Sequence, residues 1–144
     1  MAAQRAGWNV LKRDSCSAGN PPHSKTLLLG NSMGEMAFYY GLSDIALIGG
    51  SYLPYGGQNL IEAIACYCAV VLGPHTFNFQ EASLLAEEAG LATRAQTMQE
   101  AVKLAQQHLS EPPHTKDIFT KFLQKNQGGI QRTLSGIRVF EDVN

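Results

Sequence analysis

Residues 44–62, DIALIGGSYLPYGGQNLIE, carry the strongest indication of how this chain folds. An apolar run at 45–48 ends in two glycines, as expected of a strand that is covered on both faces. Asn59 then stands where the N-cap of a helix belongs, and Glu62 follows three residues later. We therefore predict a buried strand, a glycine-rich loop and a helix start. Such a junction points several backbone N–H groups at one place, which is the local chemistry of an anion or nucleotide site.

Short apolar runs alternate with helical patterns along the rest of the chain. This alternation predicts an α/β fold with a Rossmann-like, mostly parallel sheet flanked by helices. Further strands are predicted at 7–13, 26–29, 69–72 and 91–94. Helices are predicted at 33–41, 60–66, 79–89, 97–108, 118–124 and 130–137. Their expected caps and stop signals are Ser32 with Glu35, Gly41, Asn78, Gly90 and Thr97, and Met98, Ala101, Val102 and Ala105 should form one apolar face.

Composition excludes several classes of protein. With 144 residues, 44% of them hydrophobic and 16% charged, the chain is long and apolar enough for one globular domain. A net charge of −1 argues against nucleic acid as a partner, and no apolar run reaches the roughly 20 residues of a membrane span. Three cysteines without framework spacing favour reduced thiols in a cytoplasmic compartment. Cys66 and Cys68 lack a second ligand pair, so we predict no metal site.

The loops that follow strands should meet at one edge of a parallel sheet. The glycine-containing loops at Gly30, Gly49 and Gly73 are therefore expected to lie together. No strict nucleotide-binding fingerprint is present, and glycines at strand ends are often only turn formers. Both readings, a ligand site and a set of turns, stay open on the residues alone.

The polar residues of these loops also have two readings. Glu62 could bind a ligand hydroxyl or merely complete a cap with Asn59, and Glu35 stands in the same relation to Ser32. His75 follows a rigid Gly-Pro pair, where a histidine is more often structural than catalytic. We find no nucleophile paired with a base, so no catalytic residue is predicted in this chain.

Four motifs in this order resemble the carboxy-terminal part of 3-deoxy-D-manno-octulosonic acid (Kdo) transferases. They are GNSMGEM at 30–36, GGS at 49–51, GGQNLIE at 56–62 and GPHTFNF at 73–79. The resemblance implies the second, donor-binding domain of a GT-B glycosyltransferase. On this basis the CMP-binding residues would be Met33, Gly34, Glu35, Asn59, Leu60, Ile61 and Glu62.

The resemblance also implies a reaction and its partners. The parent enzyme would transfer Kdo from CMP-Kdo to a lipid A precursor, without a metal or other cofactor, at the cytoplasmic face of the bacterial inner membrane. The acceptor would bind an amino-terminal domain that precedes this stretch. Asn31 stands where the family commonly has Asp, and Gln58 where it commonly has His, which leaves the roles of these two side chains open.

The family's general-base glutamate and its Pro-Arg-His donor-phosphate motif both lie upstream of the matching stretch. We therefore expect residues 1–144 to be a partial donor-binding domain, truncated at its start, with closing helices from about 112 onward. This polypeptide should be soluble and inactive as a transferase, and it could self-associate through an exposed strand edge. The alternatives are another GT-B nucleotide-sugar transferase, or a non-catalytic nucleotide-binding or scaffolding module.

Overall fold

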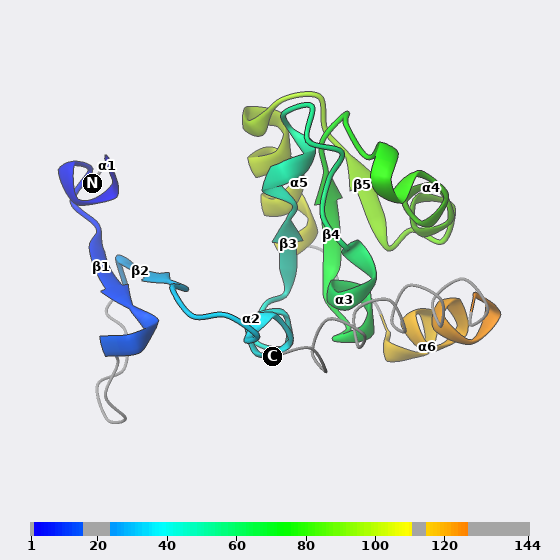
Figure 1. Ribbon diagram of the computed structural model, residues 1–144, viewed down its shortest axis with the longest axis horizontal. Coiled ribbons are helices and arrows are strands. Elements are labelled where there is room, and N and C mark those ends of the chain that lie inside the picture. Colours follow the sequence, from blue (N-terminus) through cyan, green and yellow to red (C-terminus); the bar gives the residue numbers. More distant parts are fainter. Residues whose placement is uncertain (1, 16–23, 111–114, 127–144) are drawn as a thin grey trace. The chain divides into compact units, whose positions relative to one another are not determined.

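The computed structural model describes residues 2–15, 24–110 and 115–126 (Figure 1). The helix predicted at 130–137 lies outside these residues. The chain divides into two compact units, Met1–Met36 and Ala37–Asn144.

The amino-terminal unit contains a small parallel sheet. It consists of the helix α1 (Ala2–Arg5), the strand β1 (Asn9–Lys12), the 3-10 turn η1 (Arg13–Ser15) and the strand β2 (Thr26–Leu29). The two strands pair in parallel, from Asn9 opposite Thr26 to Lys12 opposite Leu29. β1 begins later than predicted because the Trp8 N–H bonds back to the Ala3 carbonyl at 3.0 Å. Both strands predicted in this region are confirmed.

The second unit contains a parallel sheet of three strands in the order β3-β4-β5. The strands are β3 (Ile45–Leu47), β4 (Ala69–Leu72) and β5 (Ala92–Arg94). Val70 of the central strand lies opposite Ala46 on one side and Ala92 on the other. Every residue of β4 is buried, as expected of a β-branched strand covered on both faces. The predicted α/β fold with a parallel sheet is confirmed.

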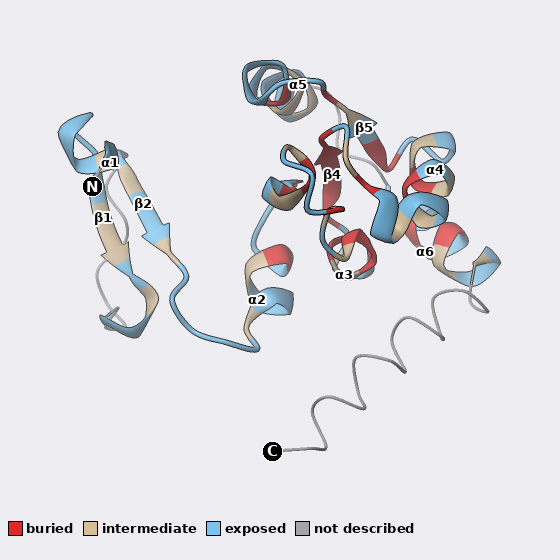
Figure 2. Ribbon diagram, turned by 45° about the horizontal axis from the view of Figure 1, so that its top comes forward, coloured by how far each residue is buried: buried red, intermediate tan, exposed pale blue. Residues whose placement is uncertain are grey.

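Helices cover both faces of this sheet. The helices in this part of the chain are α2 (Met36–Gly41), α3 (Leu60–Ala65), α4 (Gln80–Glu88), α5 (Met98–Ser110) and α6 (Lys116–Lys125), with 3-10 turns η2 (Gly49–Ser51) and η3 (Phe77–Phe79), and α3, α4 and α5 contact the strands. Figure 2 shows α5 on the opposite face of the sheet from α3 and α4. α6 packs against α3, and its Phe119 ring meets the ring of Tyr67, which follows the end of α3, edge to face at 5.9 Å. None of the helices in the described residues is long and apolar enough to cross a membrane.

Some predicted caps are confirmed. The Thr97 hydroxyl accepts a hydrogen bond from the Glu100 N–H at 3.2 Å, which fixes the start of α5. Gly90 ends α4, since its own N–H and that of Leu91 bond back to the carbonyls of Glu87 and Ala86. α2 ends at Gly41, as predicted.

The predicted start of α2 is wrong. Gly34 has a φ of +76°, a left-handed conformation that a right-handed helix does not contain, so the helix begins only at Met36. Ser32 therefore caps no helix, and its hydroxyl instead bonds to the carboxylate of Glu35.

The predicted role of Asn78 as a helix cap is also wrong. Its side chain donates to the Tyr55 carbonyl at 3.1 Å, and α4 begins at Gln80 after the turn η3.

The apolar face predicted for α5 is only partly right. Ala101 is buried against the sheet, but Met98 and Val102 are each 44% exposed. Leu104 packs against the cluster that contains Ala101, so the buried face lies further around the helix.

The core of the second unit lies between the sheet and α3, α4 and α6. Leu60, Ile64, Leu72 and Leu91 are at most 1% exposed, and Phe119 and Phe122 of α6 extend this cluster. Burying an aliphatic or aromatic side chain of this size stabilises a fold by roughly 1.5–3 kcal/mol. The same core encloses Cys68, and its burial, with Cys66 and Asp44 nearby, raises the pKa of the Cys68 thiol from an ordinary 9.0 to about 11.

The raised pKa of Cys68 predicts a loss of stability in alkali. The buried thiol stays protonated while the unfolded thiol ionises, so its contribution is complete below pH 9 and is lost as the pH rises toward 11. We expect the free energy of unfolding to fall by about 2 kcal/mol over this range on account of this group. Urea unfolding at several pH values should show a shallower fall for Cys68→Ala. An identical pH dependence in the two proteins would contradict this account.

Candidate functional site

One buried side chain, that of Ser51, joins the loops that follow β3 and β4. Its hydroxyl accepts a hydrogen bond from the Gly73 N–H at 2.6 Å and donates one to the Ile48 carbonyl. The Ser51 carbonyl in turn accepts from the His75 N–H at 2.9 Å. Ser51 is 0% exposed, so each of these groups depends on its protein partner. The loops at Gly49 and Gly73 thus lie together as predicted, whereas Gly30 belongs to the other unit.

The contact between these two loops leaves no room for a side chain at Gly73. A Cβ built there would lie 2.4 Å from the carbonyl oxygen of Ser51 and 2.8 Å from the backbone nitrogen of Tyr52. Both neighbours are backbone atoms, which cannot move aside as the end of a flexible side chain could. Glycine is therefore required here by the close approach of two loops.

Asn78, in the loop that follows β4, forms hydrogen bonds to the glycine-rich loop at residues 52–58. Its backbone N–H donates to the Gly56 carbonyl at 3.1 Å, while its side-chain amide donates to the carbonyl of Tyr55. Two contacts with Asn78 therefore hold the loop at residues 52–58 by its adjacent residues Tyr55 and Gly56. His75 is half-buried where these two loops meet. Its carbonyl oxygen lies 3.4 Å from the position that a Cβ on Gly57 would take.

The start of α3 presents one carboxylate in a fixed place. The Asn59 side chain accepts a hydrogen bond from the Ile61 N–H at 3.1 Å, and its amide donates to Glu62 Oε1 at 3.1 Å. Asn59 is therefore the predicted N-cap and also orients the half-buried Glu62. Leu60 and Ile61 point into the core, at 0% and 2% exposure, so any contact they make with a ligand is through the main chain.

The other predicted site residues, Met33, Gly34 and Glu35, belong to the amino-terminal unit. Met33 is 97% exposed, and Gly34 is exposed beside it. Glu35 is half-buried and forms an ion pair with Arg13 at 3.1 Å. This group therefore offers a carboxylate and main-chain atoms, as the group at α3 does.

Arg94 at the end of β5 is a second residue that organises the loop after β4. Its guanidinium donates to the Gly73 carbonyl at 2.8 Å and to the Thr76 hydroxyl at 3.1 Å, and its Nε pairs with Glu87 at 2.8 Å. These contacts hold one wall of an open cleft of about 510 Å³. The cleft is lined by Pro74, His75, Thr76, Phe77, Gln80, Leu84, Arg94 and Gln96.

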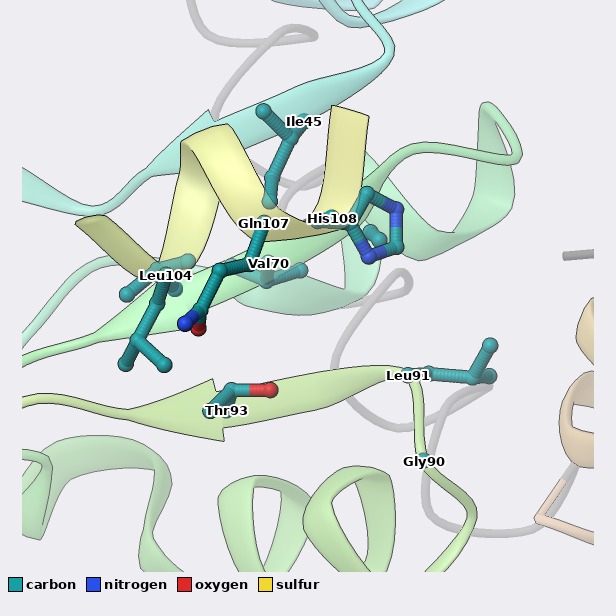
Figure 3. Close-up of a pocket in the computed structure, with 10 residues that line it drawn as sticks. Ile45, Val70, Gly90, Leu91, Thr93, Leu104, Gln107 and His108 are labelled. Atoms are coloured by element: carbon teal, nitrogen blue, oxygen red, sulfur yellow. The ribbon is translucent and has the colours of Figure 1, made fainter. Parts of the chain in front are cut away.

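A smaller pocket of about 210 Å³ lies beneath the end of α5, against the three strands of the sheet (Figure 3). Ile45, Val70, Leu91 and Leu104 supply its apolar lining, with His108 and Gln107 beside them. It contains none of the predicted site residues. Among the described residues, no cluster of three or more histidine, cysteine or acidic side chains could hold a metal ion.

Sequence reasoning did not assign the roles of Ser51 and Arg94. Their contacts with the loop after β4 join residues 18 to 22 positions apart, and such separations leave no periodicity in a sequence. A serine directly after two glycines at the end of an apolar strand is the one available signal, since a buried hydroxyl there must find partners.

Comparison with known proteins identifies relatives of this chain. A 3-deoxy-D-manno-octulosonic acid transferase of Bordetella pertussis is 40% identical over 137 residues, which are 93% of this chain and 32% of that protein. The transferase of the same name from Haemophilus influenzae is 33% identical over 128 residues, or 86% of this chain and 30% of that protein. The chain thus spans about a third of the length of these curated relatives. No protein-family model matches it.

A solved structure supports the same relationship. The C-terminal CMP-Kdo binding domain of WaaA from Acinetobacter baumannii superposes with a TM-score of 0.70 at 29% identity. The match covers 85% of this chain and 63% of that domain structure. The resemblance inferred from the four sequence motifs is therefore confirmed, and so is the predicted fold.

Proposed function

We propose that this chain, a homologue of the carboxy-terminal part of Kdo transferases, binds the CMP portion of a CMP-Kdo donor. The observation that carries the proposal is its likeness, in sequence and in fold, to a domain that binds CMP-Kdo. The geometry at the carboxyl ends of β3 and β4 agrees, because ligands of parallel α/β sheets bind in the loops at that edge.

Glu62 and Asn59 are the proposed ribose-binding pair. A carboxylate accepts hydrogen bonds from sugar hydroxyls, and the hydrogen bond of 3.1 Å from the Asn59 amide restrains the Glu62 carboxylate before any ligand binds. The main chain of Leu60 and Ile61 would contact the same nucleotide. Met33, Gly34 and Glu35 are proposed as its second group of contacts, with Glu35 as a further hydroxyl acceptor.

The whole protein's reaction is proposed on the same basis. It transfers Kdo to a lipid A precursor in lipopolysaccharide synthesis at the cytoplasmic face of the inner membrane, as an inverting GT-B enzyme without a cofactor. The departing CMP would be stabilised by hydrogen-bond donors fixed before the reaction. Residues 1–144 alone would not perform this transfer. β3 and β5 are the outer strands of their sheet, and pairing along such an edge would give a homo-oligomer.

A nucleotide panel tests the proposed function and separates it from its alternatives. We expect CMP to bind with a dissociation constant near 1 mM, or about −4 kcal/mol, and UMP, UDP, AMP and GMP to bind more weakly. Amide chemical shifts followed during each titration give the affinities. A preference for UDP would favour a different GT-B donor. Absence of binding to every nucleotide would favour a scaffolding module and contradict the proposal.

A further inference from the structure

The loops that follow β1 and β2 are joined by an ion pair. Arg13 lies directly after β1, and its guanidinium donates to Glu35 Oε1 at 3.1 Å. Glu35 follows β2, and its second oxygen receives the hydroxyl of Ser32. The Arg13 and Glu35 side chains are only 35% and 30% exposed, so this pair is screened less than a fully solvated one.

A second contact joins the same two loops. The Asn31 amide donates to Asp14 Oδ2 at 2.7 Å, and Asn31 Oδ1 accepts from the Asp14 N–H at 3.3 Å. An aspartate at position 31 would set two carboxylates against each other here. The amide replaces that repulsion with a hydrogen bond, so Asn31 and Asp14 form a matched pair. Two adjacent residues of one loop, Arg13 and Asp14, thus hold two residues of the other.

We propose that Arg13 is a positioning residue, which fixes the Glu35 carboxylate so that it can accept a hydrogen bond from a ribose hydroxyl of CMP. The inference rests on the proposed function and deepens it by assigning a residue outside the four motifs. Arg13 itself need not touch the nucleotide.

The physical argument concerns the freedom of a glutamate side chain. A free glutamate loses rotamer entropy when it is ordered against a ligand, and a carboxylate that is already held loses less. A charge-assisted hydrogen bond from a guanidinium is also directional, because its donors form a rigid fork. Arg13 and Ser32 each engage one oxygen of Glu35, so two contacts fix the direction of its carboxylate.

Discrimination between ribose and deoxyribose tests this proposal. Dissociation constants for CMP, 2′-deoxy-CMP and 3′-deoxy-CMP are measured by amide chemical shifts for the wild-type chain, Glu35→Ala and Arg13→Met. We define discrimination as the ratio of the dissociation constant of a deoxy nucleotide to that of CMP. For one of the two hydroxyls this ratio should be roughly ten in the wild-type chain, the effect of one hydrogen bond to a charged group, and close to one in Glu35→Ala. Arg13→Met should lower discrimination at that same hydroxyl at least threefold, and the double variant should lower it no further than Glu35→Ala does.

Matched variants make each outcome decisive. Lys12→Met removes the same charge one residue earlier and should leave the discrimination unchanged, while Arg13→Lys should recover part of it. Asn31→Asp should lower it, and the exchange Asp14→Asn with Asn31→Asp should restore it. If Arg13→Met weakened the binding of all three nucleotides equally, or of none, the inference would be overturned, although the proposal that the chain binds CMP would stand. Failure of the wild-type chain to bind CMP would overturn the proposed function itself, and this inference with it.

Discussion

Gly73→Ala should lower the free energy of unfolding by about 3 kcal/mol or more, at the upper end of what an inserted methyl group costs in a packed interior. The reason is geometric. The new Cβ would lie 2.4 Å from the Ser51 carbonyl oxygen, in a place where both chains are held by hydrogen bonds. Relief requires the loops to part. The Gly73 N–H would then lose its bond to the Ser51 hydroxyl, which adds the cost of unsatisfied buried groups.

Gly49→Ala is the matched control for this prediction. Gly49 lies in the loop that contacts Gly73, but a Cβ on Gly49 would meet nothing within 4 Å. Its unfolding free energy should stay within about 0.5 kcal/mol of the wild-type value, as for most exposed substitutions. Urea denaturation of the two variants and the parent measures both effects. Equal midpoints for Gly73→Ala and the wild-type chain would show that these loops are not in tight contact.

Glu62→Ala should weaken CMP binding about tenfold to a hundredfold, which corresponds to losing a hydrogen bond between a ribose hydroxyl and a carboxylate. Stability should change far less, because Glu62 is only half-buried and α3 keeps its N-cap, Asn59. Glu81→Ala is the control, since Glu81 also lies in the first turn of a helix but is exposed on α4. Equal loss of affinity in the two variants would indicate a general effect of charge rather than a contact.

The sequence predicted the elements whose signals are local. β4 reads as an unbroken apolar run, and its predicted bounds at 69–72 are those observed. The start of α3 was predicted from Asn59 because an N-cap and its helix lie within three residues of each other. The structure of such segments can be predicted from their own residues, since propensity, burial and capping all favour the same element.

The two helix caps that were predicted wrongly failed for different reasons. Ser32 and Asn78 are good caps by residue type. Because Gly34 has a left-handed φ of +76°, no helix starts after Ser32, and the Ser32 hydroxyl bonds to the nearby Glu35 carboxylate. The Asn78 side chain instead donates to the Tyr55 carbonyl, 23 positions away in the sequence. The Arg94 contacts could not be predicted either, because the pairing of β4 with β5 is what brings Gly73 and Thr76 close to the guanidinium. Sequence patterns identify suitable donors and acceptors, whereas packing selects the pairs.

The assignment of the nucleotide site can be tested by mapping amide chemical shifts while CMP is added to the wild-type chain. We predict that the largest changes fall on residues 59–62 and 33–35, and that those at 59–62 disappear in Glu62→Ala while persisting in Glu81→Ala. Changes centred on the pocket beneath α5, near Leu104 and His108, would contradict the assignment. So would changes at 59–62 that are unaltered by the loss of the Glu62 carboxylate.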